Sequence, residues 1–276
     1  MEKGHKIEHG EGRALPLISV VTVVYNDLGG LRKTVDSVNS QTWELVEHVV
    51  VDGASGDGAA DYLAELKSQV DTVWISEPDD GIYDAMNKGV GLASGDLLVF
   101  MNAGDVFSRD SVLKFVASDW TSSRWQWGFG CVRTVNSRGG VVGCQVQYPF
   151  RKRAIQLGKA FVPHQASYIS RVLFDDLNGF RTDIGVSGDQ DLLIRAGLLE
   201  QPAQWLEFLA DFELGGAHSK SSELSRQLRW HRIRRDANIM VLNCNLADLA
   251  YSYFFGSYLN ARSSLRSVRN FMRPVN

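Results

Sequence analysis

Two acidic stretches far apart in the chain carry residue types suited to group-transfer chemistry. Residues 101–105 (MNAGD) end an apolar run, and residues 187–191 (SGDQD) open a helical pattern. A carboxylate that follows a buried strand can hold a metal-bridged phosphate, and a second carboxylate can accept a proton from an attacking hydroxyl. Together the two stretches supply the minimum needed to transfer a sugar from a nucleotide.

The segments before residue 101 predict a parallel sheet that would position the first stretch. Four apolar runs rich in branched residues are typical of buried strands. These runs cover residues 17–25, 45–52, 72–76 and 96–101. Helical patterns separate them, from residue 28 to 38, up to residue 67, and from residue 82 to 92. The predicted fold class is therefore α/β, a Rossmann-like, mostly parallel sheet flanked by helices.

Polar residues follow three of these strands at the same end. They are Asn26 with Asp27, Asp52, and Asn102 with Asp105. Because parallel strands end at one edge of a sheet, we expect these side chains to line a single rim.

The loop after the first strand argues against two other nucleotide-binding classes. Residues 25–30 (YNDLGG) contain neither the GxGxxG pattern of dinucleotide-binding proteins nor a P-loop. An NAD-dependent oxidoreductase is therefore disfavoured. A sugar nucleotidyltransferase should carry a basic, glycine-rich phosphate loop here, and residues 25–30 do not supply one. This enzyme class is therefore kept as the alternative.

Composition and charge limit the compartment and the partners that the sequence predicts. The chain has 276 residues, 44% of them apolar, and its three cysteines form no CxxC pair, which fits a reducing cytoplasm. Residues 220–276 hold ten Lys/Arg against three Asp/Glu, so they carry +7 and the preceding part −10 of the net −3. Such a basic segment fits an anionic partner, either lipid headgroups or nucleic acid, and a solvated helical face is the alternative. Its apolar stretch, residues 239–259, is broken by polar residues and is not expected to span a membrane.

The ordered series of motifs resembles the family 2 glycosyltransferases with the GT-A fold, particularly bacterial members that build exopolysaccharides, capsules and glycolipids. The matching segments are residues 19–26 (SVVTVVYN), 50–55 (VVDGAS), 77–89 (EPDDGIYDAMNKG), 95–105, 163–166 (PHQA) and 188–195 (GDQDLLIR). They span roughly residues 17–216 of the chain.

The resemblance implies a donor site at the rim. Tyr25 would stack on the nucleotide base, and Asp52 would accept a hydrogen bond from the base imide. Asp80 would touch the nucleotide or cap the helix that follows it. Asn102 would also face the donor.

The resemblance further implies a divalent metal, Mg²⁺ or Mn²⁺. The family's acidic motif commonly has more carboxylates than are present here, where Asn102 and Gly104 are uncharged. Asp105 is therefore the expected metal ligand, and weak or dispensable metal binding is the alternative. His218, in a glycine-containing loop, is a candidate for closing over the donor phosphates and adding an imidazole to the metal.

The second acidic stretch would supply the base. Asp189 is expected to take the proton from the acceptor hydroxyl, with Asp191 in support and His164 near the acceptor. Leu192, Leu193 and Ile194 would pack inward, and Arg195 would emerge from the helix. We predict that Asp105 and Asp189 converge on one site with room for an activated sugar.

These expectations divide the chain into a flexible tail (residues 1–15), a GT-A catalytic domain (16–219) and a basic helical extension (220–276). Within the domain, residues 16–105 would bind nucleotide and residues 106–219 the acceptor. The predicted activity is inverting transfer of a hexose-type sugar, UDP-linked, to a saccharide or lipid-linked acceptor in cell-surface polysaccharide or glycolipid synthesis. The location would be cytoplasmic, peripheral on the inner face of the membrane, with no nucleic-acid partner. A non-catalytic interaction module built on this fold is the non-enzymatic alternative.

Overall fold

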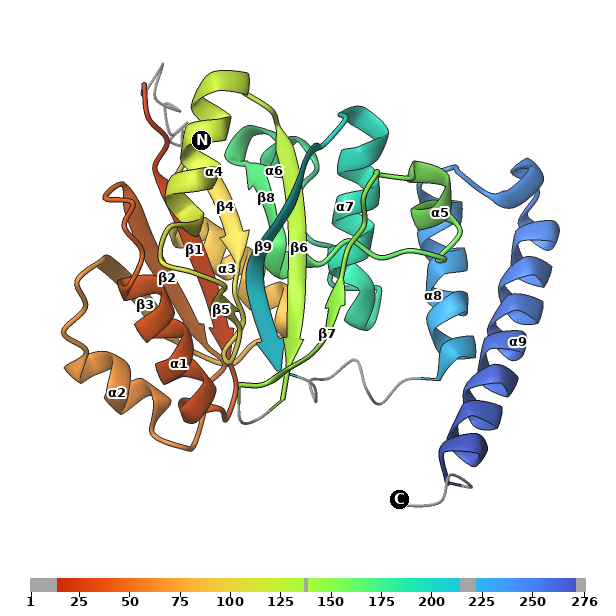
Figure 1. Cartoon of the computed structure of the whole chain (residues 1–276), viewed down its shortest axis with the longest axis horizontal. Coiled ribbons are helices and arrows are strands. Elements are labelled where there is room, and N and C mark those ends of the chain that lie inside the picture. Colours follow the sequence, from red (N-terminus) through yellow and green to blue (C-terminus); the bar gives the residue numbers. More distant parts are fainter. Residues whose placement is uncertain (1–13, 137–138, 214–221, 272–276) are drawn as a thin grey trace, which may run out of the picture.

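A single mixed sheet forms the centre of the molecule. The computed structural model describes residues 14–136, 139–213 and 222–271, and within them nine strands join in the order β3-β2-β1-β4-β8-β6-β9-β5, with β7 paired to β6. Helices cover both faces of this sheet (Figure 1). The mixed α/β architecture agrees with the fold class expected from the sequence.

The first half of the sheet is parallel, as the apolar runs predict. Its strands are β1 (Ile18–Val24), β2 (Val46–Asp52), β3 (Asp71–Ser76) and β4 (Leu97–Phe100). All residues of β1, β2 and β4 are buried, and β3 lies at the edge with alternating exposure. Val24 pairs with Asp52, so the two strands end side by side.

The second half of the sheet is mixed. It contains β5 (Val106–Phe107), β6 (Trp127–Val135), β7 (Val141–Gln145), β8 (Ser167–Ser170) and β9 (Ala203–Glu213). Strand β8 runs antiparallel to both β4 and β6, whereas β6 and β9 are parallel. Strand β8 therefore links the two halves of the sheet.

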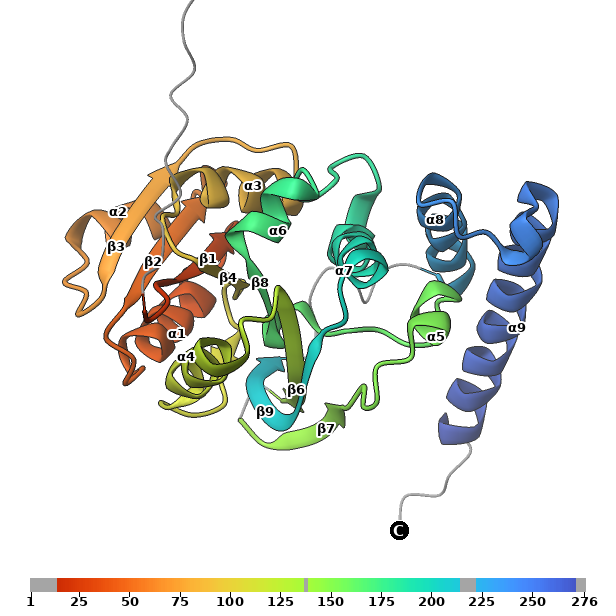
Figure 2. The ribbon, with the colours of Figure 1, turned by 90° about the horizontal axis from the view of Figure 1, so that it is seen from above.

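Two layers of helices sandwich the sheet, as seen from above in Figure 2. On one face lie α1 (Leu28–Asn39), α2 (Ala59–Glu65) and α4 (Val112–Ser123). On the other lie α3 (Ile82–Leu92), α6 (Arg171–Asp176) and α7 (Gly188–Leu199). The short α5 (Lys152–Gln156) stands beside α8. Asp27 caps α1 by accepting from the Gly30 N–H at 2.8 Å, which fixes where the helix begins.

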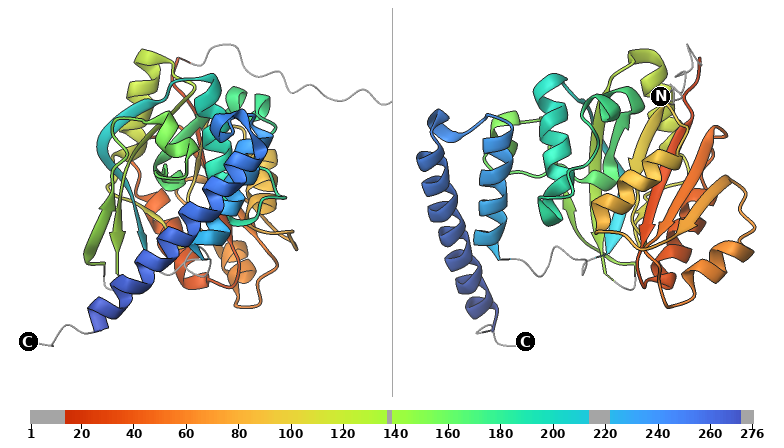
Figure 3. Two further views of the ribbon diagram at one scale, coloured as in Figure 1. Left: turned by 90° about the vertical axis from the view of Figure 1, so that its right-hand side faces the viewer. Right: turned by 180° about the vertical axis from the view of Figure 1, so that it is seen from behind.

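The basic C-terminal segment forms two helices, α8 (Glu223–Asp236) and α9 (Asn245–Phe271). Helix α8 packs against the helices that cover the sheet, because Trp230 and Ile233 are buried in the same apolar cluster as residues of α3 and α7. Helix α9 is the outermost element and packs along α8 (Figure 3). None of the helices, over the residues that are described, has the length and apolarity required to cross a bilayer.

A buried ion pair joins the two C-terminal helices. Arg234 and Asp248 are both fully buried, with Nε 2.7 Å from Oδ1. Burial alone would raise the pKa of Asp248, but hydrogen bonds from Arg234, the Val241 N–H and His231 lower it below its ordinary value. Arg234 also reaches the Ser252 hydroxyl at 2.5 Å. Because each charge is satisfied by the other, removal of either one would leave an uncompensated buried charge.

Inside the sheet, His48 of β2 is another buried titratable group. Its Nε2 lies 2.8 Å from the Thr22 hydroxyl of β1, and its Nδ1 has no hydrogen-bond partner within the described ranges. Burial lowers the pKa of His48 from 6.5 to about 4, since the charged imidazolium cannot be hydrated there. The folded protein therefore keeps this imidazole neutral.

This neutral histidine predicts acid sensitivity. Between the unfolded pKa of 6.5 and the folded value of about 4, the unfolded chain binds a proton that the folded protein does not. The free energy of unfolding should therefore fall as pH drops through this window, with a contribution of about 3 kcal/mol from His48. Urea titrations of His48→Gln should give a flatter pH dependence than wild type over the same window. An unchanged slope would contradict the assignment.

Candidate active site

The loops after β1 and β2 are held together at one edge of the sheet. The Asn26 N–H donates to the Ser55 hydroxyl at 2.8 Å, and the Gly56 N–H donates back to Asn26 Oδ1 at 2.8 Å. The Leu28 N–H adds a bond of 2.7 Å to Asp57 Oδ2. The polar residues at the ends of β1 and β2 therefore share one rim, as predicted from strand direction.

Asp52 lies at this rim but faces inward. Its side chain is fully buried, and its carboxylate accepts from the Ser55 N–H at 3.2 Å and from the Ser76 hydroxyl at 2.6 Å. These bonds shape the turn that begins at Gly53. A direct bond from Asp52 to a nucleotide base stays a prediction, and it would require an exchange of these internal partners.

Tyr25 is an exposed residue at this rim. Its side chain is 70% exposed and stands beside Gly53, where an added Cβ would lie 3.3 Å from the Tyr25 ring. The same added Cβ would lie 2.6 Å from Asp79 Oδ2, so the lack of a side chain at Gly53 lets Asp79 approach. Tyr25 and Asp79 thus lie on either side of the buried Gly53.

Asp79 lies beside the predicted Asp80 and is the closer of the two to Gly53. Asp80 is exposed, and helix α3 has Gly81 as its N-cap with no side-chain cap bond. The capping alternative for Asp80 is therefore wrong. Asp79 instead accepts from the Gly81 N–H at 2.8 Å. The sequence shows Asp79 and Asp80 as two consecutive carboxylates. Which of the two bonds to the Gly81 N–H is determined by the geometry of the turn.

The loop after β4 presents Asp105 in a buried position. Thr34 of α1 holds this loop, because its hydroxyl donates to the Asp105 carbonyl at 2.8 Å and accepts from the Gly104 N–H at 3.0 Å. Burial raises the pKa of Asp105 to about 6, against the opposing effects of His164, Gln165 and the Asn102 backbone. A carboxylate in this environment gains from a cation beside it.

Asn102 supplies a second oxygen near Asp105. Its Oδ1 is buried and has no hydrogen-bond partner among the described residues, while its Nδ2 faces His164 Nε2 at 3.3 Å. A buried, unpaired oxygen in the same loop as a buried carboxylate fits a hard divalent cation that takes its other ligands from phosphate. No cluster of three His, Cys, Asp or Glu side chains suited to a metal occurs in the described part of the chain. The described side chains therefore offer few ligands to a metal ion.

Asp189 lies in the first turn of α7, where three side chains surround it. The Tyr83 hydroxyl donates to Oδ1 at 3.0 Å, the Gln190 amide donates to Oδ2 at 3.2 Å, and His164 Nδ1 lies 3.3 Å from Oδ2. Burial raises the pKa of Tyr83 far above its ordinary value, and the Asp189 charge raises it further. The Tyr83 hydroxyl therefore stays protonated and remains a donor.

His164 connects the two acidic stretches. Its Nδ1 faces Asp189, its Nε2 faces Asn102, and its ring is close enough to Asp105 to feel that charge. Burial alone would lower the pKa of His164, but Asp189 and Asp105 raise it above its ordinary value. The predicted convergence of Asp105 and Asp189 is found, with an imidazole between them. Two surface hollows lie elsewhere, beside α4 and α2, so room for a sugar at this point stays a prediction.

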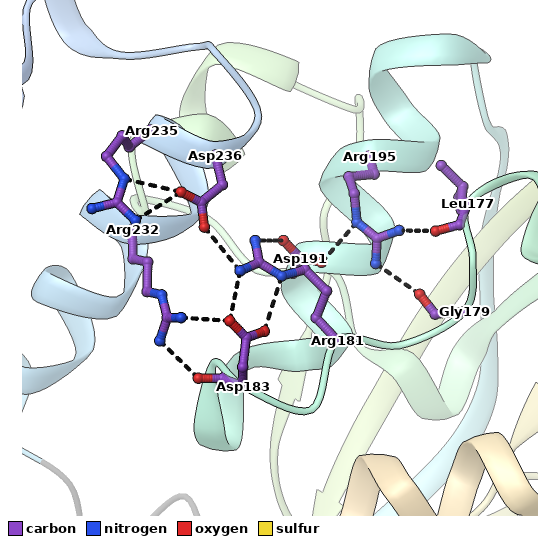
Figure 4. A network of polar contacts seen from close by, with 9 residues as sticks. All are labelled: Leu177, Gly179, Arg181, Asp183, Asp191, Arg195, Arg232, Arg235 and Asp236. Atoms are coloured by element: carbon purple, nitrogen blue, oxygen red, sulfur yellow. Dashed lines mark hydrogen bonds and ion pairs between the residues drawn. The ribbon is translucent and has the colours of Figure 1, made fainter.

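Asp191 points away from this group into an ion-pair network, drawn in Figure 4. It is buried, and its Oδ2 lies 2.7 Å from Arg195 Nε. The expectation that Arg195 emerges from α7 is wrong, because it folds back to donate to the carbonyls of Leu177 at 2.5 Å and Gly179 at 2.8 Å. Leu192, Leu193 and Ile194 are buried as predicted. Asp191 therefore supports the helix.

The same network reaches α8. Arg181 lies 3.8 Å from Asp191 Oδ1, 3.0 Å from Asp183 Oδ2 and 2.8 Å from Asp236 Oδ2. Arg232 of α8 also pairs with Asp183. The segment that leads into Asp189 is thus braced against the C-terminal helices. His218 lies outside the described residues.

Comparison with known proteins agrees with this architecture. Residues 19–118 match the glycosyl transferase family 2 profile. An uncharacterised glycosyltransferase of Mycobacterium tuberculosis is 38% identical over 221 residues, which cover 78% of this chain and 82% of that protein. The chain therefore belongs to glycosyltransferase family 2.

More distant relatives and solved structures extend the comparison. A PGL/p-HBAD biosynthesis glycosyltransferase of Mycobacterium bovis is 29% identical over 187 residues, covering 66% of this chain and 70% of that one. Staphylococcus aureus TarS, solved with UDP-GlcNAc, superposes with a TM-score of 0.66 at 17% identity, over 79% of this chain and 66% of that chain. The mannosyltransferase PcManGT of Pyrobaculum calidifontis, solved with GDP-Man and Mn²⁺, gives a TM-score of 0.62 at 17% identity, over 95% and 77%. These two structural likenesses establish the fold.

The contact between Gly188 and Tyr83 predicts a stability effect at the site. A Cβ at Gly188 would lie 2.7 Å from Cδ2 of the Tyr83 ring, so Gly188→Ala should displace the ring that orients Asp189. We expect a loss of about 1–3 kcal/mol in the free energy of unfolding from this overpacking. Gly91 of α3 is the matched control, because an added Cβ there meets nothing within 4 Å.

Chemical denaturation of the two variants makes the comparison. Gly91→Ala should leave stability unchanged or raise it by about 0.5–1 kcal/mol, since alanine is the better helix former. Equal stability of Gly188→Ala and Gly91→Ala would contradict the tight packing of Tyr83 on α7.

Proposed function

We propose that this glycosyltransferase inverts the anomeric configuration as it transfers a hexose-type sugar from a nucleotide diphosphate donor. The single observation that supports the proposal is the position of His164 between Asn102 and Asp189, which brings a donor-side residue and a carboxylate base to one place. A base close to the donor side can deprotonate an acceptor as it attacks the sugar.

Asp189 acts as the general base in this proposal. The acceptor O–H bond breaks as its proton moves to the Asp189 carboxylate, and the acceptor oxygen forms a bond to the anomeric carbon. The bond from that carbon to the diphosphate oxygen breaks, and the nucleoside diphosphate leaves with the electron pair. Because this is one displacement from the opposite side, the configuration inverts. Tyr83 and Gln190 orient the carboxylate through their bonds to its two oxygens.

Asp105 and Asn102 would hold a divalent cation together with the donor diphosphate. Mg²⁺ or Mn²⁺ suits these oxygen ligands, and when bound it offsets the charge that develops on the leaving diphosphate. The unpaired Oδ1 of Asn102 and the buried carboxylate of Asp105 support this assignment. The PcManGT complex with Mn²⁺ is a fold-level precedent.

Tyr25 and Asp79 would flank the nucleotide, with the aromatic face of Tyr25 free to stack on a base. A UDP-linked donor follows from the family resemblance, and TarS with UDP-GlcNAc is consistent with it. The acceptor would be a saccharide or a lipid-linked saccharide. The similarity to a mycobacterial PGL/p-HBAD biosynthesis enzyme favours a glycolipid. The proposed location is cytoplasmic, at the inner membrane face.

Asp189→Asn tests the base. The amide keeps the shape of the side chain but cannot take up the proton, so turnover should fall by about 10²–10⁴-fold while donor affinity stays within about threefold. Release of nucleoside diphosphate measures turnover, and NMR of the product gives the anomeric configuration. Asp61→Asn, at an exposed position of α2, is the control and should match wild type. Wild-type turnover by Asp189→Asn would remove this residue from the role.

Asp105→Asn tests the cation site. Thermal unfolding with UDP-GlcNAc, UDP-glucose and GDP-mannose, each with and without Mn²⁺, should reveal a donor that stabilises wild type by several degrees. The Mn²⁺-dependent part of that shift should disappear in Asp105→Asn, because a neutral amide is a weaker ligand for a hard cation. Stabilisation of both proteins to the same extent by Mn²⁺ would argue against the assignment. Absence of stabilisation by any nucleotide sugar would favour the non-catalytic alternative.

A further inference from the structure

The outward face of α9 is apolar and aromatic. Five large side chains are exposed along it, and at about 100° per residue they form a broad stripe over about half of the helix circumference. They are Leu246 (77% exposed), Leu249 (40%), Tyr253 (54%), Phe254 (71%) and Tyr258 (57%). Because α9 is the outermost element of the fold, none of the described elements covers this stripe (Figures 1 and 3).

The stripe is not needed to attach α9 to the protein. The opposite face makes that attachment through the Asp248 ion pair with Arg234 and through the Tyr251 hydroxyl, which donates to the Leu157 carbonyl at 3.0 Å. At Gly256 helix α9 lies so close to α8 that an added Cβ would be 2.8 Å from the Leu224 Cα. The inner face therefore fixes the rotation of α9, and the stripe is held outward.

Charge distinguishes the partners that such a face could accept. Residues 220–276 carry a surplus of seven positive charges over negative ones. Arg262, one turn after Tyr258, is exposed just beyond the edge of this stripe. A second copy of this chain would bring a segment of the same charge against it, whereas an anionic bilayer would attract it. Tyrosine and arginine side chains next to Leu and Phe also suit the boundary between lipid headgroups and acyl chains.

We propose that the outward face of α9 is a docking surface for an anionic lipid bilayer, with Leu246 and Phe254 inserted below the headgroups and Arg262 at the phosphates. The proposal rests on the proposed membrane location and deepens it by naming the surface responsible. The helix would lie in the plane of the interface, with the catalytic body on its aqueous side.

Vesicle co-sedimentation of the full-length protein tests the surface. Vesicles of phosphatidylcholine with a minority of phosphatidylglycerol should bind wild type, and pure phosphatidylcholine or high salt should weaken binding. The double variant Leu246→Ser/Phe254→Ser should bind at least about 10-fold more weakly, because two large apolar groups no longer enter the interface. Val172→Ser on α6 is the matched control, since Val172 is 56% exposed but lies off α9. It should bind as wild type does.

Two results would overturn the proposal. One is equal vesicle binding by wild type and the double variant, which includes binding by neither. The other is a wild-type dimer that the double variant converts to a monomer in light scattering, because the stripe would then belong to a second copy. Turnover without vesicles should be the same in the double variant as in wild type. A failure at this surface can therefore be told apart from a failure of the glycosyltransferase mechanism.

Discussion

The imidazole of His164 connects the two halves of the molecule. Asn102 and Asp105 follow the parallel half of the sheet, and Asp189 begins a helix more than eighty residues later. Both carboxylates are buried, and two buried negative charges near each other would repel. The raised pKa of His164 means that a shared positive charge is favoured between them. The arrangement of the site depends on this compensation, because a positive charge between the two carboxylates offsets their repulsion.

The parallel half of the fold and its rim could be predicted from sequence. Its strands are short apolar runs of branched residues separated by helices, so local pattern and tertiary burial agree. The polar residues that end these strands then meet because the strands are parallel and β1 and β2 end in register. Nothing beyond chain direction was required for that part of the site.

The other half was less predictable because its structure depends on contacts between distant segments. The Tyr83 hydroxyl meets Asp189 across 106 positions, and no local pattern encodes that bond. The inward turn of Asp52 depends on Ser76 of a neighbouring strand, and the return of Arg195 depends on carbonyls of the preceding loop. Likewise, the turn at Gly81 determines that Asp79, and not Asp80, accepts the Gly81 N–H. In each case the sequence shows the residue type, whereas the direction of the side chain depends on its distant partners.

The union of α8 with α9 has a further consequence for how this protein family can diversify. Helix α8 belongs to the catalytic core through Trp230 and Ile233, whereas α9 is oriented by a directional clasp between Arg234 and Asp248. Because both charges are buried, either residue could be replaced only together with its partner, for example by an apolar pair of similar volume. The orientation of the last helix could thus change during evolution through paired substitutions, while the sheet and its covering helices keep their structure.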